Sequence, residues 1–127
     1  MTLRRVFALN FVLAVCFGAT CVLAPRALCA LYGLTADTGA VWTSRLLGGS
    51  LLGFASLMWF GARTPSVEVQ RAIAAALLIQ DLVGAAASLA VQVGGAMNAI
   101  GWSNVLIYAL LGASYAYLLV VPTRRTN

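Results

Sequence analysis

The chain has 127 residues, of which 62% are hydrophobic and 9% are charged, whereas about a quarter of the residues in a soluble domain are usually charged. This balance excludes an ordinary soluble domain and indicates a membrane protein. The chain has no lysine or histidine, so its positive charge comes from eight arginines, and three acidic residues leave a formal net charge of +5. We expect these arginines to contact lipid phosphates at helix ends and not to bind nucleic acid.

Four apolar stretches follow one another, and a spanning helix needs about 20 residues. Four spans with short connections therefore occupy a single transmembrane domain, residues 1–127. The first span is expected over residues 6–24, after Arg4 and Arg5. At about 19 residues this run is longer than the apolar part of a secretory signal, which favours a retained helix.

Pro25 ends the first span. The next few residues, to Tyr32, predict a short interfacial helix, because proline suits the first helical position and Gly33 suits the C-terminal stop. The second span is expected over residues 41–62, with Asp37 or Thr38 as its N-cap.

The third span is expected over residues 72–93. Thr64 before it is interpreted as the N-cap, with Pro65 at the first helical position. The fourth span is expected over residues 100–121, after a tight turn at 94–98. Such short connections imply antiparallel neighbours, so the fold class is all-α: an integral membrane four-helix antiparallel bundle with a short interfacial helix after the first span.

Arginines are distributed unequally between the two sides of this bundle. Six lie on the amino-terminal side and two on the other: Arg4, Arg5, Arg63, Arg71, Arg124 and Arg125 against Arg26 and Arg45. The positive-inside rule therefore places both termini in the cytoplasm. Aromatic residues suggest the same topology, with Trp42 and Trp102 at the outer interface and Trp59, Tyr115 and Tyr117 near the inner one.

Asp81 is the only carboxylate inside an expected span, and ionisable groups there cost at least a few kcal/mol and often mark function. Helical spacing places Gly84 or Ala85, Ser88 and Gln92 on the face of Asp81, which we expect to contact protein. Arg45, extended inward, nearly reaches the depth of Asp81. The candidate polar cluster is Asp81, Arg45, Ser88, Gln92, Asn104 and Tyr108.

Three interpretations of this cluster stay open. Asp81 is the protonatable group of a site for a small molecule, a quinone or a proton; or it belongs to an internal ion pair, or is neutral, and specifies helix packing; or it contacts a partner subunit. Small multidrug transporters of this length carry a glutamate in the first span, whereas Asn10 is the strongly polar residue there.

Small residues form ridges that allow helices to approach closely. The helix-packing candidates are Gly48, Gly49, Gly53, Gly84 and Gly112. They serve packing within the bundle, or dimerisation and docking to a larger complex. Three cysteines, Cys16, Cys21 and Cys29, show no metal-ligand spacing, and a bridge between Cys21 and Cys29 stays open.

Three short motifs resemble those of small, mostly uncharacterised four-helix membrane proteins beside the DoxX-type family. These are Leu31-Tyr32-Gly33-Leu34, Arg45-Leu46-Leu47-Gly48-Gly49 and Gly101-Trp102. Some DoxX-type proteins serve as membrane subunits of quinone-linked oxidoreductases, so the resemblance implies an accessory role here, by analogy of fold. The expected location is a bacterial inner membrane. Any redox cofactor would belong to a partner.

The sequence therefore predicts a non-catalytic accessory or assembly subunit of a larger membrane complex. The alternative is a small carrier or binding protein for a hydrophobic or quinone-like molecule, using the cluster around Asp81. Neither role makes the chain an enzyme, and no cofactor or metal is expected. The expected partners are the lipid bilayer, other membrane subunits or further copies of the chain, and, in the alternative, the hydrophobic small molecule.

Overall fold

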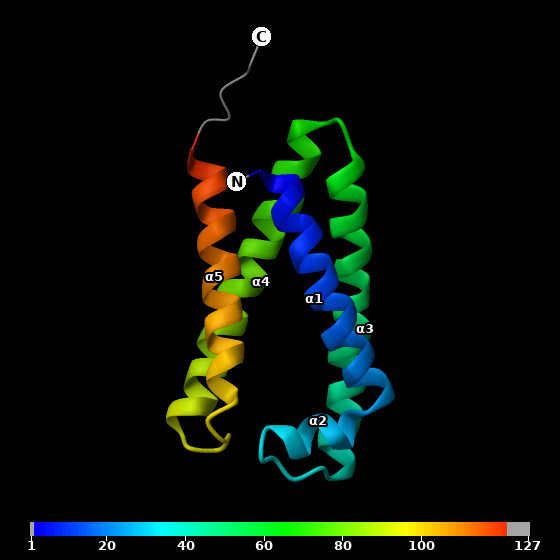
Figure 1. Cartoon of the computed structure of the whole chain (residues 1–127), viewed down its shortest axis with the longest axis vertical. Helices are drawn as coiled ribbons and strands as arrows, with labels where there is room; N and C mark the ends of the chain where they lie inside the picture. Colours follow the sequence, from blue (N-terminus) through cyan, green and yellow to red (C-terminus); the bar gives the residue numbers. More distant parts are fainter. Residues whose placement is uncertain (1, 122–127) are drawn as a thin grey trace.

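Residues 2–121 are described by a computed structural model, and within them the chain forms five helices and no strand (Figure 1). The all-α prediction is confirmed. The helices are α1 (Leu3–Leu23), α2 (Pro25–Leu31), α3 (Thr38–Arg63), α4 (Val67–Val93) and α5 (Gly101–Val120). The basic residues predicted at the carboxyl end, Arg124 and Arg125, lie outside the described residues.

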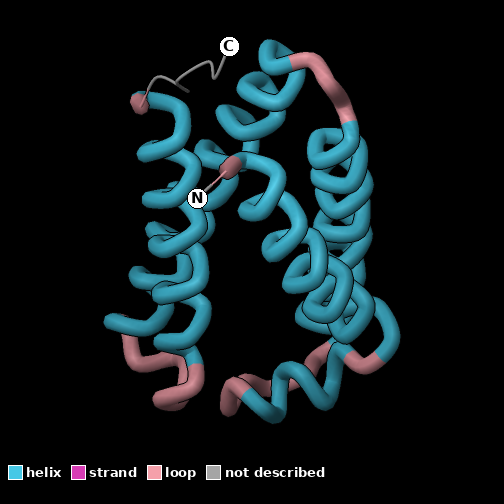
Figure 2. The backbone as a smooth tube through the Cα atoms, turned by 45° about the horizontal axis from the view of Figure 1, so that its top comes forward, coloured by secondary structure: helices cyan, strands magenta, loops and turns pink. Residues whose placement is uncertain are grey.

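The four long helices lie as two antiparallel pairs, α1 with α3 and α4 with α5 (Figures 1 and 2). Contacts within each pair are dense, whereas contacts between the pairs are sparse. α1 approaches α5 near its amino end and diverges from it toward α2, where the two pairs are farthest apart (Figure 1). The short helix α2 lies across this wider end.

Glycine allows α1 and α3 to cross closely. A Cβ atom on Gly48 would lie 2.6 Å from the backbone oxygen of Gly18, and one on Gly18 would lie 3.1 Å from the backbone oxygen of Gly48. Ser44, one turn earlier, donates its hydroxyl to the backbone oxygen of Cys21 at 3.3 Å. The predicted packing role of Gly48 therefore fits this crossing.

The pair α4 and α5 uses its glycines differently, because side chains lie on them. A Cβ atom on Gly84 would lie 2.8–2.9 Å from the ring of Tyr108, and one on Gly112 would lie 3.4 Å from Cβ of Asp81. Gly84 and Gly112 therefore give space to two of the polar residues singled out in the sequence. This packing fixes Tyr108 and Asp81 between the helices.

The helix boundaries follow local capping chemistry. Asp37 is the N-cap of α3, since its Oδ1 accepts from the amide of Ala40 at 2.7 Å, which selects one of the two predicted caps. The predicted Thr64 cap is wrong: the N-cap of α4 is Ser66, whose hydroxyl accepts from the amide of Val69. Thr64 instead ends α3 in extended backbone, as a residue before proline prefers.

The short helix after α1 is confirmed, with Pro25 at its start. Gly33 ends it with φ +73°, a backbone conformation that side chains with a Cβ rarely adopt. The amide of Leu34 then donates to the backbone oxygen of Cys29 at 2.8 Å. This stop turns the chain back toward α3.

Three helices, α1, α4 and α5, are long and apolar enough to cross a membrane. α3 has the length, but glycines, serines and Arg45 lower its hydropathy, so the four-span prediction stays a prediction. Many large apolar side chains point outward, among them Leu23 at 82% and Val120 at 81% exposure. Tyr115 is fully buried, and its hydroxyl accepts a hydrogen bond from Asn10; its expected position near the inner interface stays a prediction.

Candidate binding pocket between the helix pairs

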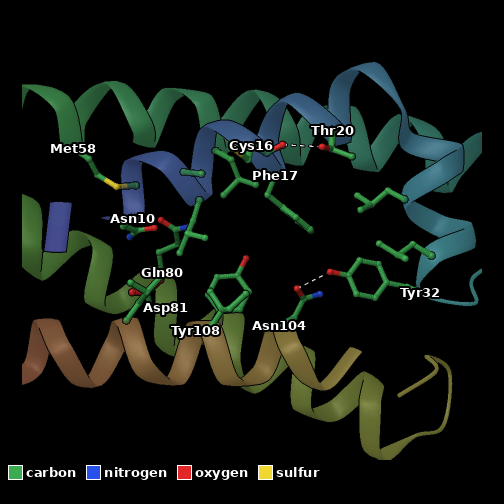
Figure 3. Close-up of a pocket in the computed structure, with 17 residues that line it drawn as sticks. Asn10, Cys16, Phe17, Thr20, Tyr32, Met58, Gln80, Asp81, Asn104 and Tyr108 are labelled. Carbon is green, nitrogen blue, oxygen red and sulfur yellow. Dashed lines mark hydrogen bonds between the residues drawn. The ribbon is translucent and has the colours of Figure 1, made fainter. Parts of the chain in front are cut away.

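A pocket of about 330 Å³ lies where the two helix pairs diverge (Figure 3). All five helices contribute to its walls, which are mainly apolar with a few polar groups at both ends. Its polar lining residues are Asn10, Cys16, Thr20, Tyr32, Gln80, Asp81, Asn104 and Tyr108. Apolar walls with a few placed polar groups are typical of small-molecule sites, and the volume lies at the small end of their range.

Asn10, Gln80 and Asp81 gather at one end of the pocket (Figure 3). Asp81 is 2% exposed, and its Oδ2 has no hydrogen-bond partner within residues 2–121; Oε1 of Gln80 is likewise buried without a partner. The Asn10 amide is used, since it donates to the Tyr115 hydroxyl at 3.0 Å. At this end of the pocket, two buried side-chain oxygens therefore receive no hydrogen bond from residues 2–121.

The opposite end of the pocket is closed by a hydrogen-bonded set. The Tyr32 hydroxyl donates to Oδ1 of Asn104 at 2.9 Å (Figure 3). Asn98, from the turn before α5, donates its amide side chain to the backbone oxygen of Leu31 at 2.8 Å and its backbone amide to that of Tyr32 at 3.0 Å. These bonds join the end of α2 to the pair α4 and α5.

The mouth of the pocket is marked by residues that both line it and are exposed. These are Leu13, Cys16 and Thr20 of α1, Leu31 of α2 and Ile107 of α5. They place the opening between α1 and α5, on the side of the molecule and not at its end. The opening therefore faces the surface that carries the outward apolar side chains.

Three of the six predicted cluster residues line this pocket: Asp81, Asn104 and Tyr108. Ser88 is half-buried on the same face of α4, and Gln92 is buried and donates to the backbone oxygen of Asn98. The expected inward stripe on α4 is thus present. Ser88 and Gln92 lie on it between Asp81 and the turn after α4, outside the pocket.

Arg45 does not join Asp81, contrary to the predicted cluster. It is exposed and lines a separate hollow with Arg26 and Val41, beside the junction of α1 and α2. The physical reason is that α3 pairs with α1, which places Arg45 beside the residues that join α1 to α2. Among residues 2–121, no arginine lines the pocket.

Gly49 and Gly53 do not pack within the chain, unlike the other glycines singled out. A Cβ atom on either would meet nothing within 4 Å. Gly48, Leu51 and Ala55 form the buried face of α3, and the Gly49-x-x-x-Gly53 ridge points away from it. Of the two predicted uses of this ridge, packing within the molecule is wrong.

Sequence reasoning did not assign Asn10, Gln80 or Tyr32 to the site. Asn10 was visible as the one strongly polar residue in the first apolar run, which is a recognised signal of interhelical bonding. Gln80 precedes Asp81, and neighbouring positions on a helix do not share a face. Tyr32 lies in a turn. Their convergence depends on the pairing of the helices, which the sequence pattern does not give.

The cysteines and acids do not form a metal centre. Cys21 and Cys29 are buried and unbridged, and Cys16 is exposed. Among residues 2–121, no group of three cysteine or acidic side chains lies close enough to hold an ion. The chemistry that the pocket offers is thus hydrogen bonding and one carboxyl group within apolar walls.

Comparison of the chain with protein-family models, curated proteins and solved structures finds no match. The resemblance to DoxX-type proteins stays a prediction.

Proposed function

We propose that this chain is an integral membrane protein that binds a small, largely apolar molecule in the pocket between its helix pairs. The observation that carries the proposal is the unpartnered Oδ2 of Asp81 at the end of a pocket with apolar walls. A buried polar atom without a partner costs about 1–3 kcal/mol. A bound molecule that supplies a partner would offset this cost, and the proposed role is non-catalytic.

The distribution of polarity supports residence in a bilayer. Large apolar side chains such as Ile79, Leu82 and Leu110 are exposed at 60–68%, whereas Asn10 and Asp81 are buried. In water such an outer surface would be an aggregation or interaction surface, while in lipid it is solvated. We infer that α3 spans the membrane with the other three long helices, as a four-helix bundle.

The position of the pocket mouth supports access from the lipid. Leu13, Leu31 and Ile107 at the rim are apolar and partly exposed, so an apolar molecule reaches the pocket without crossing a polar surface. An amphipathic molecule would enter sideways and place its polar group toward Asp81. This is the carrier or binding-protein role that the sequence offered as its alternative.

The proposal is tested by native mass spectrometry of the protein released gently from its own membrane. Ile107→Trp fills the mouth, whereas Leu106→Trp, at the neighbouring and more exposed position outside the pocket, adds the same bulk toward lipid. We expect a discrete small-molecule mass on the wild type and on Leu106→Trp, lost from Ile107→Trp. Absence of any bound mass, or equal retention in both variants, would contradict the proposal.

The accessory-subunit role is a second proposal, and the outward Gly49-x-x-x-Gly53 ridge favours it. Glycines on a free face allow a partner helix to approach closely, and no residue in the described range 2–121 covers them. Gly53→Leu would block that approach, and Leu57→Ile, on an exposed position of the same helix, serves as the control. Copurification of a stoichiometric membrane subunit with the wild type and the control, but not with Gly53→Leu, would support this role.

A further inference from the structure

At the Asp81 end of the pocket, more side-chain oxygens can accept hydrogen bonds than are bonded. Asp81 Oδ2 and Gln80 Oε1 are acceptors without partners, and the nearby Asn10 amide already donates to Tyr115. Two acceptors at this end of the pocket are therefore left without a donor. A molecule that complements them must bring donors.

The charged groups at this end of the pocket are also unbalanced, because an acidic side chain has no basic side chain beside it. In the part of the chain that the structure describes, Asp81 is the one acidic residue lining the pocket, and no arginine lines it. Arg45, on α3, is exposed beside Arg26 in the separate hollow, and α1 brings only neutral groups to the pocket. α2 and α5 likewise present apolar side chains, Tyr32, Asn104 and Tyr108. A carboxylate in these surroundings lacks a counter-ion, and buried charges in proteins are normally paired.

The unpartnered acceptors and the missing counter-ion favour some small molecules over others that fit the pocket. A quinone offers carbonyl oxygens, which are acceptors and cannot donate to Oδ2 of Asp81 or Oε1 of Gln80. An ammonium group offers both donors and the missing positive charge. The rings of Phe17 and Tyr108, which also line the pocket, are surfaces that cations favour.

Resting on the proposed function, we propose that the pocket is selective for an amphipathic amine, with its ammonium group against Asp81 and Gln80. The apolar body of the amine lies among Leu13, Leu51 and Leu111, which line the pocket from three helices. Selectivity resides in the carboxyl group, and the apolar walls bind charged and neutral molecules of the same shape alike.

Two rigid probes of equal shape test this inference: 1-adamantylamine, which is protonated at neutral pH as an alkylamine like lysine, and 1-adamantanol. Binding is measured by equilibrium dialysis to the full chain in zwitterionic nanodiscs, and protein-free nanodiscs correct for partition into lipid. Wild type should bind the amine about tenfold more tightly than the alcohol, since hydrogen bonds to charged groups are among the stronger ones.

The decisive variant is Asp81→Asn, and its matched control is Glu68→Gln. Glu68 is an acid on the same helix, exposed and outside the pocket. Asp81→Asn should lose the preference for the amine and keep its affinity for the alcohol, which also shows that the variant is folded. Glu68→Gln should keep the preference of the wild type.

Equal binding of the two probes by the wild type would overturn the amine inference, as would a preference that survives in Asp81→Asn. Binding of neither probe would overturn it as well. The proposed function is judged separately, because the mass retained from the native membrane and its loss in Ile107→Trp do not depend on either probe.

Discussion

Contacts within the two helix pairs differ in kind from contacts across the seam between the pairs. Within a pair, backbones approach over glycine, as at Gly18 and Gly48, or side chains lie on glycine, as Tyr108 does on Gly84. Across the seam the contacts are few, and several are polar. This contrast indicates that contacts within the pairs stabilise the fold most, whereas the seam leaves room for a ligand.

The largest effect on stability should follow from Gly48→Ala. Its Cβ atom would lie 2.6 Å from the backbone oxygen of Gly18, so α1 and α3 must separate. Overpacking of this kind costs about 1–3 kcal/mol. The matched Gly49→Ala, which meets nothing within 4 Å, should be neutral or slightly stabilising. Unfolding in mixed micelles measures both, and equal losses would break the distinction between the two glycines.

The next effect concerns the buried bond across the seam between Asn10 and Tyr115. Tyr115→Phe leaves the Asn10 amide without its acceptor, and a double-mutant cycle with Asn10→Leu isolates the pair. We expect a coupling of about 1 kcal/mol, within the range measured for interhelical hydrogen bonds in membranes. Additive single effects would show that this end of the seam is held by apolar packing alone.

A smaller loss should follow from Tyr32→Phe at the wide end of the seam. This variant removes the bond to Asn104, which is only part-buried, so the amide left behind can find another partner. The expected cost is about 0.5 kcal/mol, at the low end for a single hydrogen bond. Amide hydrogen exchange should rise in α2 and the 94–100 turn. Unchanged exchange there would show that the bond between Tyr32 and Asn104 does not hold α2 against α5.

No loss of stability is expected from Asp81→Asn. Oδ2 of Asp81 has no partner to leave behind, and the Cβ contact with Gly112 is retained. The same unfolding assay applies, without added ligand. A marked destabilisation would reveal a structural role for the carboxyl group and favour the packing interpretation of Asp81 over the binding one.

The fold was largely predictable from the sequence, whereas the site was only partly so. Apolar runs give the long helices, and local chemistry gives the Asp37 cap and the Gly33 stop, because both depend on neighbours in the chain. Thr64 failed as a cap because Ser66, closer to the helix, competes for the same role.

Depth along a helix can be counted from sequence, but which helices pair cannot. Arg45 and Asp81 are at compatible depths, yet they do not meet because α3 pairs with α1. The four-residue spacing of Gly49 and Gly53 likewise shows that they share a face but not that this face is free. The inward face of α4, marked by Asp81 and Gln92, was predicted because polar residues on an apolar helix are costly to expose to lipid and therefore face protein.

The most direct test of the account is photo-crosslinking in the native membrane after uniform replacement of methionine by its diazirine analogue. Among the described residues, Met58 lines the pocket and is buried, while Met97 lies in the turn before α5 and outside the pocket. We predict a discrete small-molecule adduct on the peptide containing Met58 and none on that containing Met97. Crosslinks from Met58 to neighbouring side chains or phospholipid alone would contradict a bound ligand in the seam.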